Sequence, residues 1–191
     1  MILSIRFEQA VAYALRVHSG QLRKSTSIPY VSHLLAVAGL VLEHGGDEDE
    51  AIAALLHDAV EDAGGQPRLL DIRQRFGERV ADIVLGCTDT DVTPKPPWRA
   101  RKEAYIAHLK NASPSARLVS CCDKLHNCRT IVSDLYVHGD EVWKKFTGGR
   151  DGTPWYYGAL LDEYRRLEVP RHLVDELERT VHAMQTLAAR S

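Results

Sequence analysis

The sequence predicts an all-α fold in a single domain that spans residues 1–191. Apolar residues recur three and four positions apart along most of the chain, which is the period of one helix face. No stretch of useful length shows the alternation typical of a half-buried strand. With 191 residues, 45% of them hydrophobic and 26% charged, the chain is long enough to bury a core of its own.

Five helices are expected in the first half of the chain, each bounded by a recognisable start or stop residue. Glycines at 45–46, 64–65 and 77 favour helix ends, because glycine adopts the left-handed conformation that follows many helices. Asp47 followed by Glu50 has the spacing of a capping box and starts the third helix. The expected ranges are 5–18, 31–43, a helix after Asp47 that includes 51–62, 67–77 and 78–87.

A loop with three prolines, residues 88–97, separates these helices from the second half of the chain. Ser113 is a typical N-cap, and Pro114 suits the first position of the helix that follows it. The expected elements are helices at 98–110, 115–136 and 141–146, a loop at 147–153, a helix from Pro154 to Tyr164, and a last helix opened by Pro170.

Composition narrows the possible partners and the compartment. A net charge of −2 gives no reason to expect nucleic acid or an acidic membrane as a partner. The four cysteines form no CxxC pair and no disulfide framework, which is typical of buried thiols in a reducing cytosol. Arg6 and Glu8 interrupt the N-terminal apolar run, so it indicates an amphipathic helix and not a signal peptide. A cytoplasmic protein is expected, and its oligomeric state stays open.

The strongest chemical signal is the segment LLHDAVED, residues 55–62. His57 and Glu61 are four residues apart, as are Asp58 and Asp62, so on one helix both pairs lie over one sector of the surface. Four such groups repel one another and are costly to desolvate unless a cation or protons compensate. Imidazole and carboxylate together suit a divalent ion such as manganese, iron or zinc. A solvated helix end explains the segment less well, because acids there oppose the helix dipole.

Two distant residues are further candidates for the same site. His33 lies at the start of an apolar helix, where a histidine is more often a satisfied core residue than a ligand. Asp123 places a carboxylate within the largely apolar segment LVSCCDKLHN, and buried carboxylates almost always have a partner. Neither residue identifies a site by itself.

The order of His33, His57–Asp58 and Asp123 resembles that of the HD superfamily of metal-dependent phosphohydrolases. The local strings are most similar to the hydrolase domain of RelA/SpoT proteins and to the small alarmone hydrolases. A bare HD doublet is weak evidence, but HDAVED followed by DKLHN is highly specific. The matching pieces are RKSTSIPYVSH, ALLHDAVED, the Phe76–Gly77 pair and DKLHN, and the resemblance extends from the first helix to about Tyr164.

This resemblance implies an HD-type domain of about nine or ten helices around one divalent ion, usually manganese. It also implies removal of the 3′-pyrophosphate of ppGpp or pppGpp. Residue by residue, it makes His33, His57, Asp58 and Asp123 the metal ligands. Glu61 and Asp62 become the acidic pair that acts on the attacking water, with the main base of the two left open. Matched to substrate contacts are Arg23, Lys24, Tyr30, Lys95, Arg101, Lys124, Asn127 and Tyr156, or its neighbour Tyr157.

Several interpretations stay open. The same metal core could act on a different nucleotide, because it acts on phosphate and not on the base. A non-catalytic nucleotide sensor that kept the fold is a third possibility. Ser25 departs from the better-known family members, which have glycine or an acidic residue after the Arg–Lys pair. Cys122 precedes a proposed ligand, and a buried core thiol is favoured there over an oxidation-sensitive one.

Overall fold

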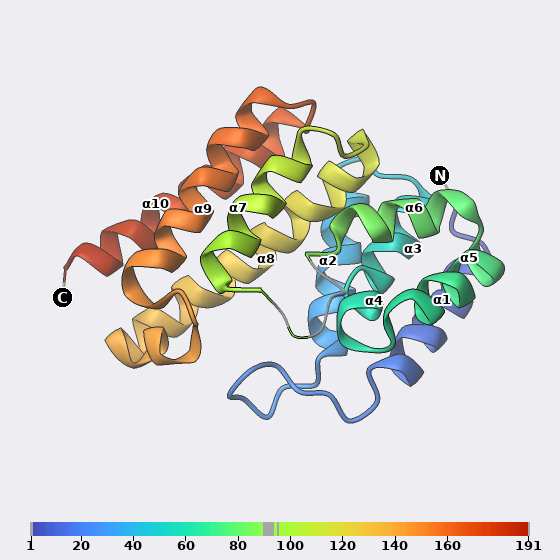
Figure 1. Ribbon diagram of the computed structural model, residues 1–191, viewed down its shortest axis with the longest axis horizontal. Coiled ribbons are helices and arrows are strands. Elements are labelled where there is room, and N and C mark those ends of the chain that lie inside the picture. The colour runs from blue at the N-terminus through green and yellow to red at the C-terminus, as the bar shows by residue number, and fades with distance from the viewer. Residues whose placement is uncertain (1, 90–93, 95, 191) are drawn as a thin grey trace.

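The predicted all-α class is confirmed by the computed structural model, which describes residues 2–89, 94 and 96–190. Within those ranges the chain forms helices and no strand, as Figure 1 shows. The elements are α1 (Ile5–Val17), α2 (Val31–Glu43), α3 (Glu48–Leu56), α4 (Ala59–Asp62), α5 (Gly65–Phe76), α6 (Glu78–Cys87), α7 (Trp98–Leu109), α8 (Pro114–His138), the 3-10 helix η1 (Gly139–Lys145), α9 (Gly149–Arg166) and α10 (Arg171–Ala189).

The long helix α8 crosses the molecule and joins its two halves. It packs against α2, α3 and α6, which belong to the N-terminal half, and against α9, α10 and η1, which belong to the C-terminal half (Figure 1). The helix begins where the sequence predicts, because the Ser113 side chain accepts a hydrogen bond from the Ala116 N–H and Pro114 follows it. The middle of α8 therefore lies near the centre of the protein.

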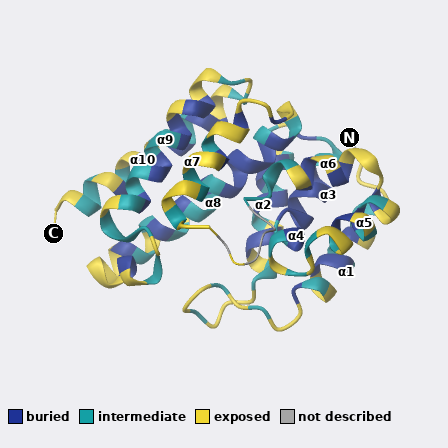
Figure 2. Ribbon diagram, viewed as in Figure 1, coloured by how far each residue is buried: buried dark blue, intermediate teal, exposed yellow. Residues whose placement is uncertain are grey.

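The core gathers along α3 and α8. Every residue from 51 to 56 is fully buried, and Figure 2 shows the same dark blue on the central part of α8. Cys121, Cys122 and Cys128 lie in this core as free thiols, and burial raises the pKa of each of them. Among the helices of the described residues, none combines the length and apolar character that crossing a bilayer requires.

The third predicted helix is interrupted, so the expectation of one continuous helix over 51–62 is wrong. α3 ends at Leu56 and α4 starts at Ala59, although His57 and Asp58 keep right-handed helical dihedrals. The His57 ring nitrogen Nδ1 lies 2.7 Å from the Ala54 carbonyl oxygen. That carbonyl is the one that the Asp58 N–H would use in a continuous helix. The side chain thus competes with the backbone at the point where the two predicted ligands lie.

The start of α9 is also earlier than predicted. The helix begins at Gly149, so most of the expected loop at 147–153 is helical and Pro154 lies inside the helix. The indole of Trp98 packs closely on this segment, where a Cβ at Gly148 would come within 2.6 Å of the ring. The segment predicted as a short helix at 141–146 is η1, shifted two residues toward the N-terminus at its start.

Candidate metal and nucleotide site

Four predicted ligands converge from three parts of the chain. His33 comes from the first turn of α2, His57 and Asp58 from the junction of α3 and α4, and Asp123 from α8. His33 Nε2 lies 3.1 Å from Asp123 Oδ1 and 3.7 Å from Asp58 Oδ2. His57 Nε2 lies 3.0 Å from Asp58 Oδ2 and 3.6 Å from Asp123 Oδ1. Two imidazoles and two carboxylates therefore share one small, largely buried volume.

The donor set fits one divalent ion. The Nε2 atoms of His33 and His57 are buried and have no hydrogen-bond partner in the described part of the chain. The contact of His57 Nδ1 with the Ala54 carbonyl requires a ring proton on Nδ1, so Nε2 is the ring nitrogen that can bind an ion, and it faces the carboxylates. Unprotonated imidazole nitrogens beside carboxylates are the ligands that divalent transition metals take in proteins. Ligand atoms of His33, His57 and Asp58 lie within 4.8 Å of one another, as a shared ion requires.

His126 orients His33, and the sequence analysis did not single it out. The two Nδ1 atoms lie 2.8 Å apart, so one ring must donate and the other accept. Burial, followed by the nearby charges of His33 and Arg23, lowers the pKa of His126 to about 4. When His126 accepts, the proton lies on His33 Nδ1 and the His33 Nε2 atom is free for an ion. The spacing of three residues from Asp123 is the one sequence signal that places His126 on the same side of α8.

Both carboxylates of the cluster are held in the ionised form. Burial acts to raise the pKa of Asp58, but the attraction of His57 outweighs it and the pKa lies well below its usual range. Burial likewise opposes ionisation of Asp123, and the charge of Lys124 is the largest of the effects that lower its pKa. Lys124 Nζ lies 2.5 Å from Asp123 Oδ2. The Tyr30 hydroxyl donates to Asp58 Oδ2 at 2.5 Å, and burial together with this charge raises the pKa of Tyr30.

The acidic pair lies on the short helix α4, one turn beyond Asp58. Asp62 is exposed and accepts a hydrogen bond from Gln21 Nε2 at 2.9 Å. Glu61 is half-buried, and its charge is one of the smaller causes, after burial, that raise the pKa of Tyr156. The two acids thus face different neighbours. Asp62 is hydrogen-bonded to the loop before α2, whereas the charge of Glu61 influences the pKa of a tyrosine on α9.

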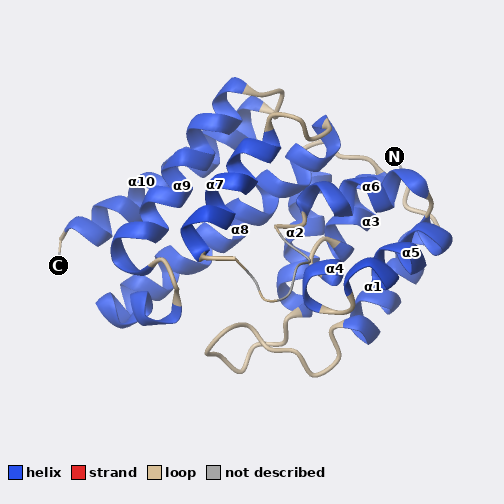
Figure 3. Cartoon of the chain, in the orientation of Figure 1, coloured by secondary structure: helices blue, strands red, loops and turns tan. Residues whose placement is uncertain are grey.

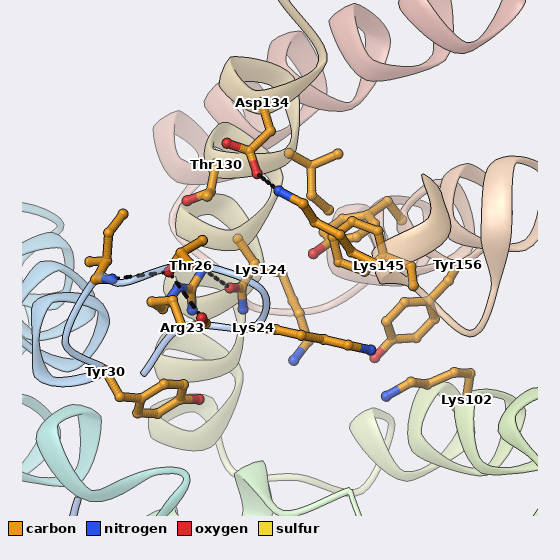
Figure 4. Close-up of a pocket in the computed structure, with 15 residues that line it drawn as sticks. Arg23, Lys24, Thr26, Tyr30, Lys102, Lys124, Thr130, Asp134, Lys145 and Tyr156 are labelled. Atoms are coloured by element: carbon orange, nitrogen blue, oxygen red, sulfur yellow. Dashed lines mark hydrogen bonds and ion pairs between the residues drawn. The ribbon is translucent and has the colours of Figure 1, made fainter. Parts of the chain in front are cut away.

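A cavity of about 350 Å³ lies beside the cluster and is drawn in Figure 4. Six of the predicted substrate contacts line it, and they come from the loop before α2, from α8 and from α9: Arg23, Lys24, Tyr30, Lys124, Asn127 and Tyr156. Lining residues that sequence reasoning missed include Lys102, Thr130, Asp134, Lys145 and Phe146. They are brought together only by the packing of α7, α8 and η1, and no local motif marks them.

A pair of hydrogen bonds connects the cavity to the cluster. Arg23 Nη2 donates to Asn127 Oδ1 at 2.9 Å, and Asn127 Nδ2 donates to Asp123 Oδ1 at 2.5 Å. The Arg23 guanidinium also lies over the Tyr30 ring, 5.9 Å from its centroid. A ligand that displaces Arg23 would therefore also change the hydrogen bonding of the Asp123 carboxylate, through Asn127.

Of the two remaining predicted contacts, one is described by the structure, and it does not line the cavity. Arg101 does not line it. The Arg101 guanidinium donates to Asp89 Oδ2 at 2.5 Å and to the Pro96 carbonyl at 3.2 Å, and Lys102 donates to the same Asp89 oxygen at 2.8 Å. Lys102 lines the cavity in its place, since one residue along a helix turns the side chain by about 100°. Lys95 lies outside the described residues.

The loop between α1 and α2, drawn as the long tan segment in Figure 3, presents the Arg23–Lys24 pair. Leu22 and Pro29 form an antiparallel bridge across it, and the Thr26 N–H donates to the Arg23 carbonyl at 3.0 Å. Ser25 occupies the third position of this turn with φ of +59°, a left-handed conformation that favours glycine. Glycine adopts this conformation without strain, and asparagine or aspartate tolerates it better than most other residues.

A buried group of imidazoles and carboxylates that borders a cationic cavity is the arrangement of a metal-dependent hydrolase of anionic substrates. The comparison with known families agrees with this class. Residues 10–154 match the family described as HD domain, and the chain belongs to that family. The resemblance inferred from the motifs is therefore confirmed.

Three relatives of this chain carry names that refer to ppGpp hydrolysis. The chain is 37% identical over 126 residues to the guanosine-3′,5′-bis(diphosphate) 3′-pyrophosphohydrolase MESH1 of Xenopus tropicalis, covering 64% of this chain and 68% of that protein. The human protein of the same name is 35% identical, with the same coverage. The bifunctional (p)ppGpp synthase/hydrolase SpoT of Escherichia coli is 34% identical over 134 residues, which cover 67% of this chain and 18% of SpoT.

Solved structures agree with the fold. A structure described as a metazoan ortholog of SpoT that hydrolyses ppGpp superposes with a TM-score of 0.78 at 28% identity, covering 95% of this chain and 97% of that one. The structure of lmo0812 from Listeria monocytogenes gives a TM-score of 0.71 at 29% identity, over 81% of this chain and 99% of that one. The fold therefore extends beyond the residues in which sequence similarity is found.

Proposed function

We propose that this protein hydrolyses the 3′-pyrophosphate of ppGpp and pppGpp, with manganese as its divalent ion. Water adds across the bond between the 3′ oxygen and its phosphorus, so the products are pyrophosphate and GDP or GTP. The observation that carries the proposal is the convergence of His33, His57, Asp58 and Asp123 beside a cationic cavity. The names of its relatives supply the substrate.

The four converging side chains would hold the ion. When bound, a divalent ion lowers the pKa of a water ligand and polarises a phosphoryl oxygen. The protein contributes orientation: the Ala54 carbonyl and His126 fix the two imidazoles, and Tyr30 and Asn127 fix the two carboxylates. Such supporting hydrogen bonds keep the ligands in place and set their basicity.

Glu61 and Asp62 would manage the proton of the attacking water. A carboxylate one turn from the ligands can accept this proton in the transition state and pass it to solvent. The exposure of Asp62 suits exchange with solvent, whereas the half-buried Glu61 suits contact with the reacting water. Both side chains would act on the water and leave the ligand set to the other four residues.

The cavity would hold the remainder of the nucleotide. Lys24, Lys102 and Lys124 line it and can neutralise phosphate charges that the near-neutral chain as a whole does not attract. The planar guanidinium of Arg23 can stack on the face of a purine. Binding and chemistry would thus be divided between the cavity and the ligand cluster.

The decisive experiment is a pyrophosphate-release assay with ppGpp and Mn²⁺, with a chelator-treated sample and GDP as controls. We expect release from ppGpp only when the ion is present, and no reaction with GDP, which lacks the 3′ group. Tight ppGpp binding without release would identify a sensor. Faster hydrolysis of an adenosine alarmone, a dinucleoside polyphosphate or a nucleoside monophosphate, with ppGpp left intact, would show that the substrate is wrong.

A further inference from the structure

One acidic residue lies in an otherwise cationic cavity. Among the described residues that line it, five are basic and Asp134 is the single acid. A carboxylate repels phosphate, so it weakens a site whose whole surface binds phosphates. A part of a ligand that bonds to Asp134 must instead carry no negative charge and offer N–H or O–H donors.

Helix α8 sets the distance between this acid and the metal ligands. Asp123, Asn127, Thr130 and Asp134 follow one another at steps of four, three and four residues, so they share one face of the helix. Eleven residues separate the two aspartates, which is about 16 Å along the helix axis. A 3′-phosphorylated nucleoside can span this distance when an ion lies between Asp123 and its 3′ group and a hydrogen bond joins its base to Asp134, so a nucleotide held by its 3′ group near Asp123 directs its base toward Asp134.

Figure 4 also shows that Asp134 lies away from the metal end of the cavity. Asp134 and Lys145 lie at one edge, whereas Tyr30 and Lys102 lie at the opposite edge. Tyr30 marks the metal end, because its hydroxyl is bonded to Asp58. Asp134 is therefore on the side remote from the bond that is hydrolysed.

The residues around Asp134 suit the binding of a nucleobase. Lys145 Nζ lies 3.1 Å from Asp134 Oδ2, so an ion pair between η1 and α8 holds the carboxylate in place. Thr130 is not available as a donor, because its hydroxyl is bonded to the His126 carbonyl at 3.0 Å. Ile131 and Phe146 also line this part of the cavity and offer apolar surface to an aromatic ring.

We infer that Asp134 selects guanine by accepting hydrogen bonds from its N1–H and its 2-amino group. These two donors are adjacent on one edge of the ring and match the two oxygens of a carboxylate. Adenine offers one amino donor beside an unprotonated ring nitrogen, which a carboxylate repels. The inference rests on the proposed function only for the identity of the reaction, because it concerns the base and not the hydrolysed bond.

The test measures base selectivity. Guanosine and adenosine 3′,5′-bis(diphosphates), and the inosine analogue that lacks the 2-amino group, are compared as substrates of wild type, Asp134→Asn and Asp134→Leu. We expect Asp134→Leu to raise KM for the guanosine substrate roughly 10- to 100-fold, with a smaller rise for the inosine substrate and none for adenosine. The kcat for guanosine should change by less than about threefold, since the metal ligands are untouched.

The matched control is Asp162→Asn, which removes the same charge from an exposed acid of α9 that pairs with Arg165. It should leave KM and the guanosine-to-adenosine ratio unchanged. If Asp134 serves only as an ion-pair partner for Lys145, the variants will lower the unfolding temperature and keep that ratio within about twofold, which would overturn the inference.

Binding to the metal-free protein separates this inference from the proposed function. Calorimetry of GDP and ADP in the presence of chelator needs no hydrolysis. A preference for GDP that Asp134→Leu abolishes supports base selection even if ppGpp is not hydrolysed. Hydrolysis of ppGpp together with equal GDP and ADP binding by wild type and Asp134→Leu refutes base selection alone.

Discussion

His57 combines two hydrogen-bonding roles in one ring. Its Nδ1 is engaged with the Ala54 carbonyl, and its buried Nε2 faces the carboxylates of Asp58 and Asp123. Both roles depend on the imidazole, so no smaller side chain replaces it. We expect His57→Ala to lose bound metal and turnover together, as measured by metal analysis of the purified protein and by the pyrophosphate assay.

Variants of the acidic pair give the contrasting result. Glu61→Gln and Asp62→Asn should retain most of the metal and lose rate by roughly 10²- to 10⁴-fold, because they remove a base and not a ligand. His182→Ala, on the exposed face of α10, is the matched control and should change neither quantity. Normal hydrolysis by the His57 variant would show that the ligand assignment is wrong.

His126 tests the importance of ligand orientation. Replacement by leucine removes the hydrogen-bond partner of His33 Nδ1, so the His33 ring loses a contact that orients it. We expect His126→Leu to weaken metal binding by about 10- to 100-fold, measured by competition with a metal-sensitive dye. An unchanged affinity would mean that packing alone orients His33.

Sequence reasoning found the residues that motifs mark and missed those that packing brings together. HDAVED and DKLHN predict His57, Asp58 and Asp123 as ligands, and the structure brings these three side chains together. Arg101 was predicted as a substrate contact, but Lys102 lines the cavity instead. A matching motif can be displaced by one residue, and on a helix that displacement places a different side chain on the cavity face. Asp134 and Lys145 meet only after η1 folds back on α8, and no spacing in the sequence indicates this.

At the scale of helices, α7 is held to α9 by close packing of an indole. A Cβ at Gly148 would lie 2.6 Å from the Trp98 ring, and one at Gly152 would lie 3.1 Å from it. We expect Gly148→Ala to lower the free energy of unfolding by about 1–3 kcal/mol, measured with urea. It should also raise KM for ppGpp with little change in kcat, because α7 carries Lys102.

A helix glycine with open surroundings provides the control for this substitution. A Cβ at Gly39 in α2 would meet nothing within 4 Å. Gly39→Ala should therefore raise the free energy of unfolding by about 0.5–1 kcal/mol, as for alanine in any unstrained helix. Equal effects of the two substitutions would show that Trp98 does not restrict Gly148.

The contact between the C-terminal end of α2 and helix α10 should contribute less stability at acidic pH. The rings of His44 and His172 stack with centroids 4.5 Å apart, and burial followed by the charge of His172 lowers the pKa of His44. Glu176 acts in the opposite direction and does not outweigh them. Because the unfolded chain then binds more protons, this contribution is present above about pH 6.5 and is lost as the pH falls below it.

Urea unfolding at two pH values measures this effect. We expect His44→Phe, which keeps a ring against His172 but cannot be protonated, to lose less stability than wild type between about pH 7.5 and about pH 5.5. An identical loss in the two proteins would assign the acid sensitivity to other groups.

Helix boundaries were predictable where local chemistry determines them. The capping box at Asp47 and the Ser113 cap start helices where expected, because each satisfies backbone donors within a few residues. The break at His57 was not predictable, since it depends on a side chain that competes for a backbone carbonyl. Pro154 was predicted to open α9, but packing on Trp98 extends the helix in front of it.

For the whole molecule, the ligand cluster is a cross-link between distant parts of the chain. It joins α2, the α3–α4 junction and α8, from residue 33 to residue 123. A metal that binds only the folded protein stabilises it by mass action. With the ion at about 100 times its Kd, we expect chelation to lower the unfolding temperature by roughly 5–10 °C, measured by calorimetry. The His57→Ala protein should show no such shift.

The central position of α8 could not be predicted from the hydrophobic pattern of the sequence. Helical periodicity gave the class and most of the elements, because it is a property of neighbouring residues. Which helices surround α8 depends on contacts between residues far apart in the chain, and these leave no periodic trace.

The buried thiols of Cys121, Cys122 and Cys128 can be used to detect local opening of the protein around this central helix. They are enclosed and protonated, so an alkylating reagent reacts with them only when the protein opens around α8. Cys122 adjoins Asp123, so its labelling rate records how often that part of the helix leaves the interior. Mass spectrometry of the labelled chain can thus follow local opening around α8 without any engineered probe.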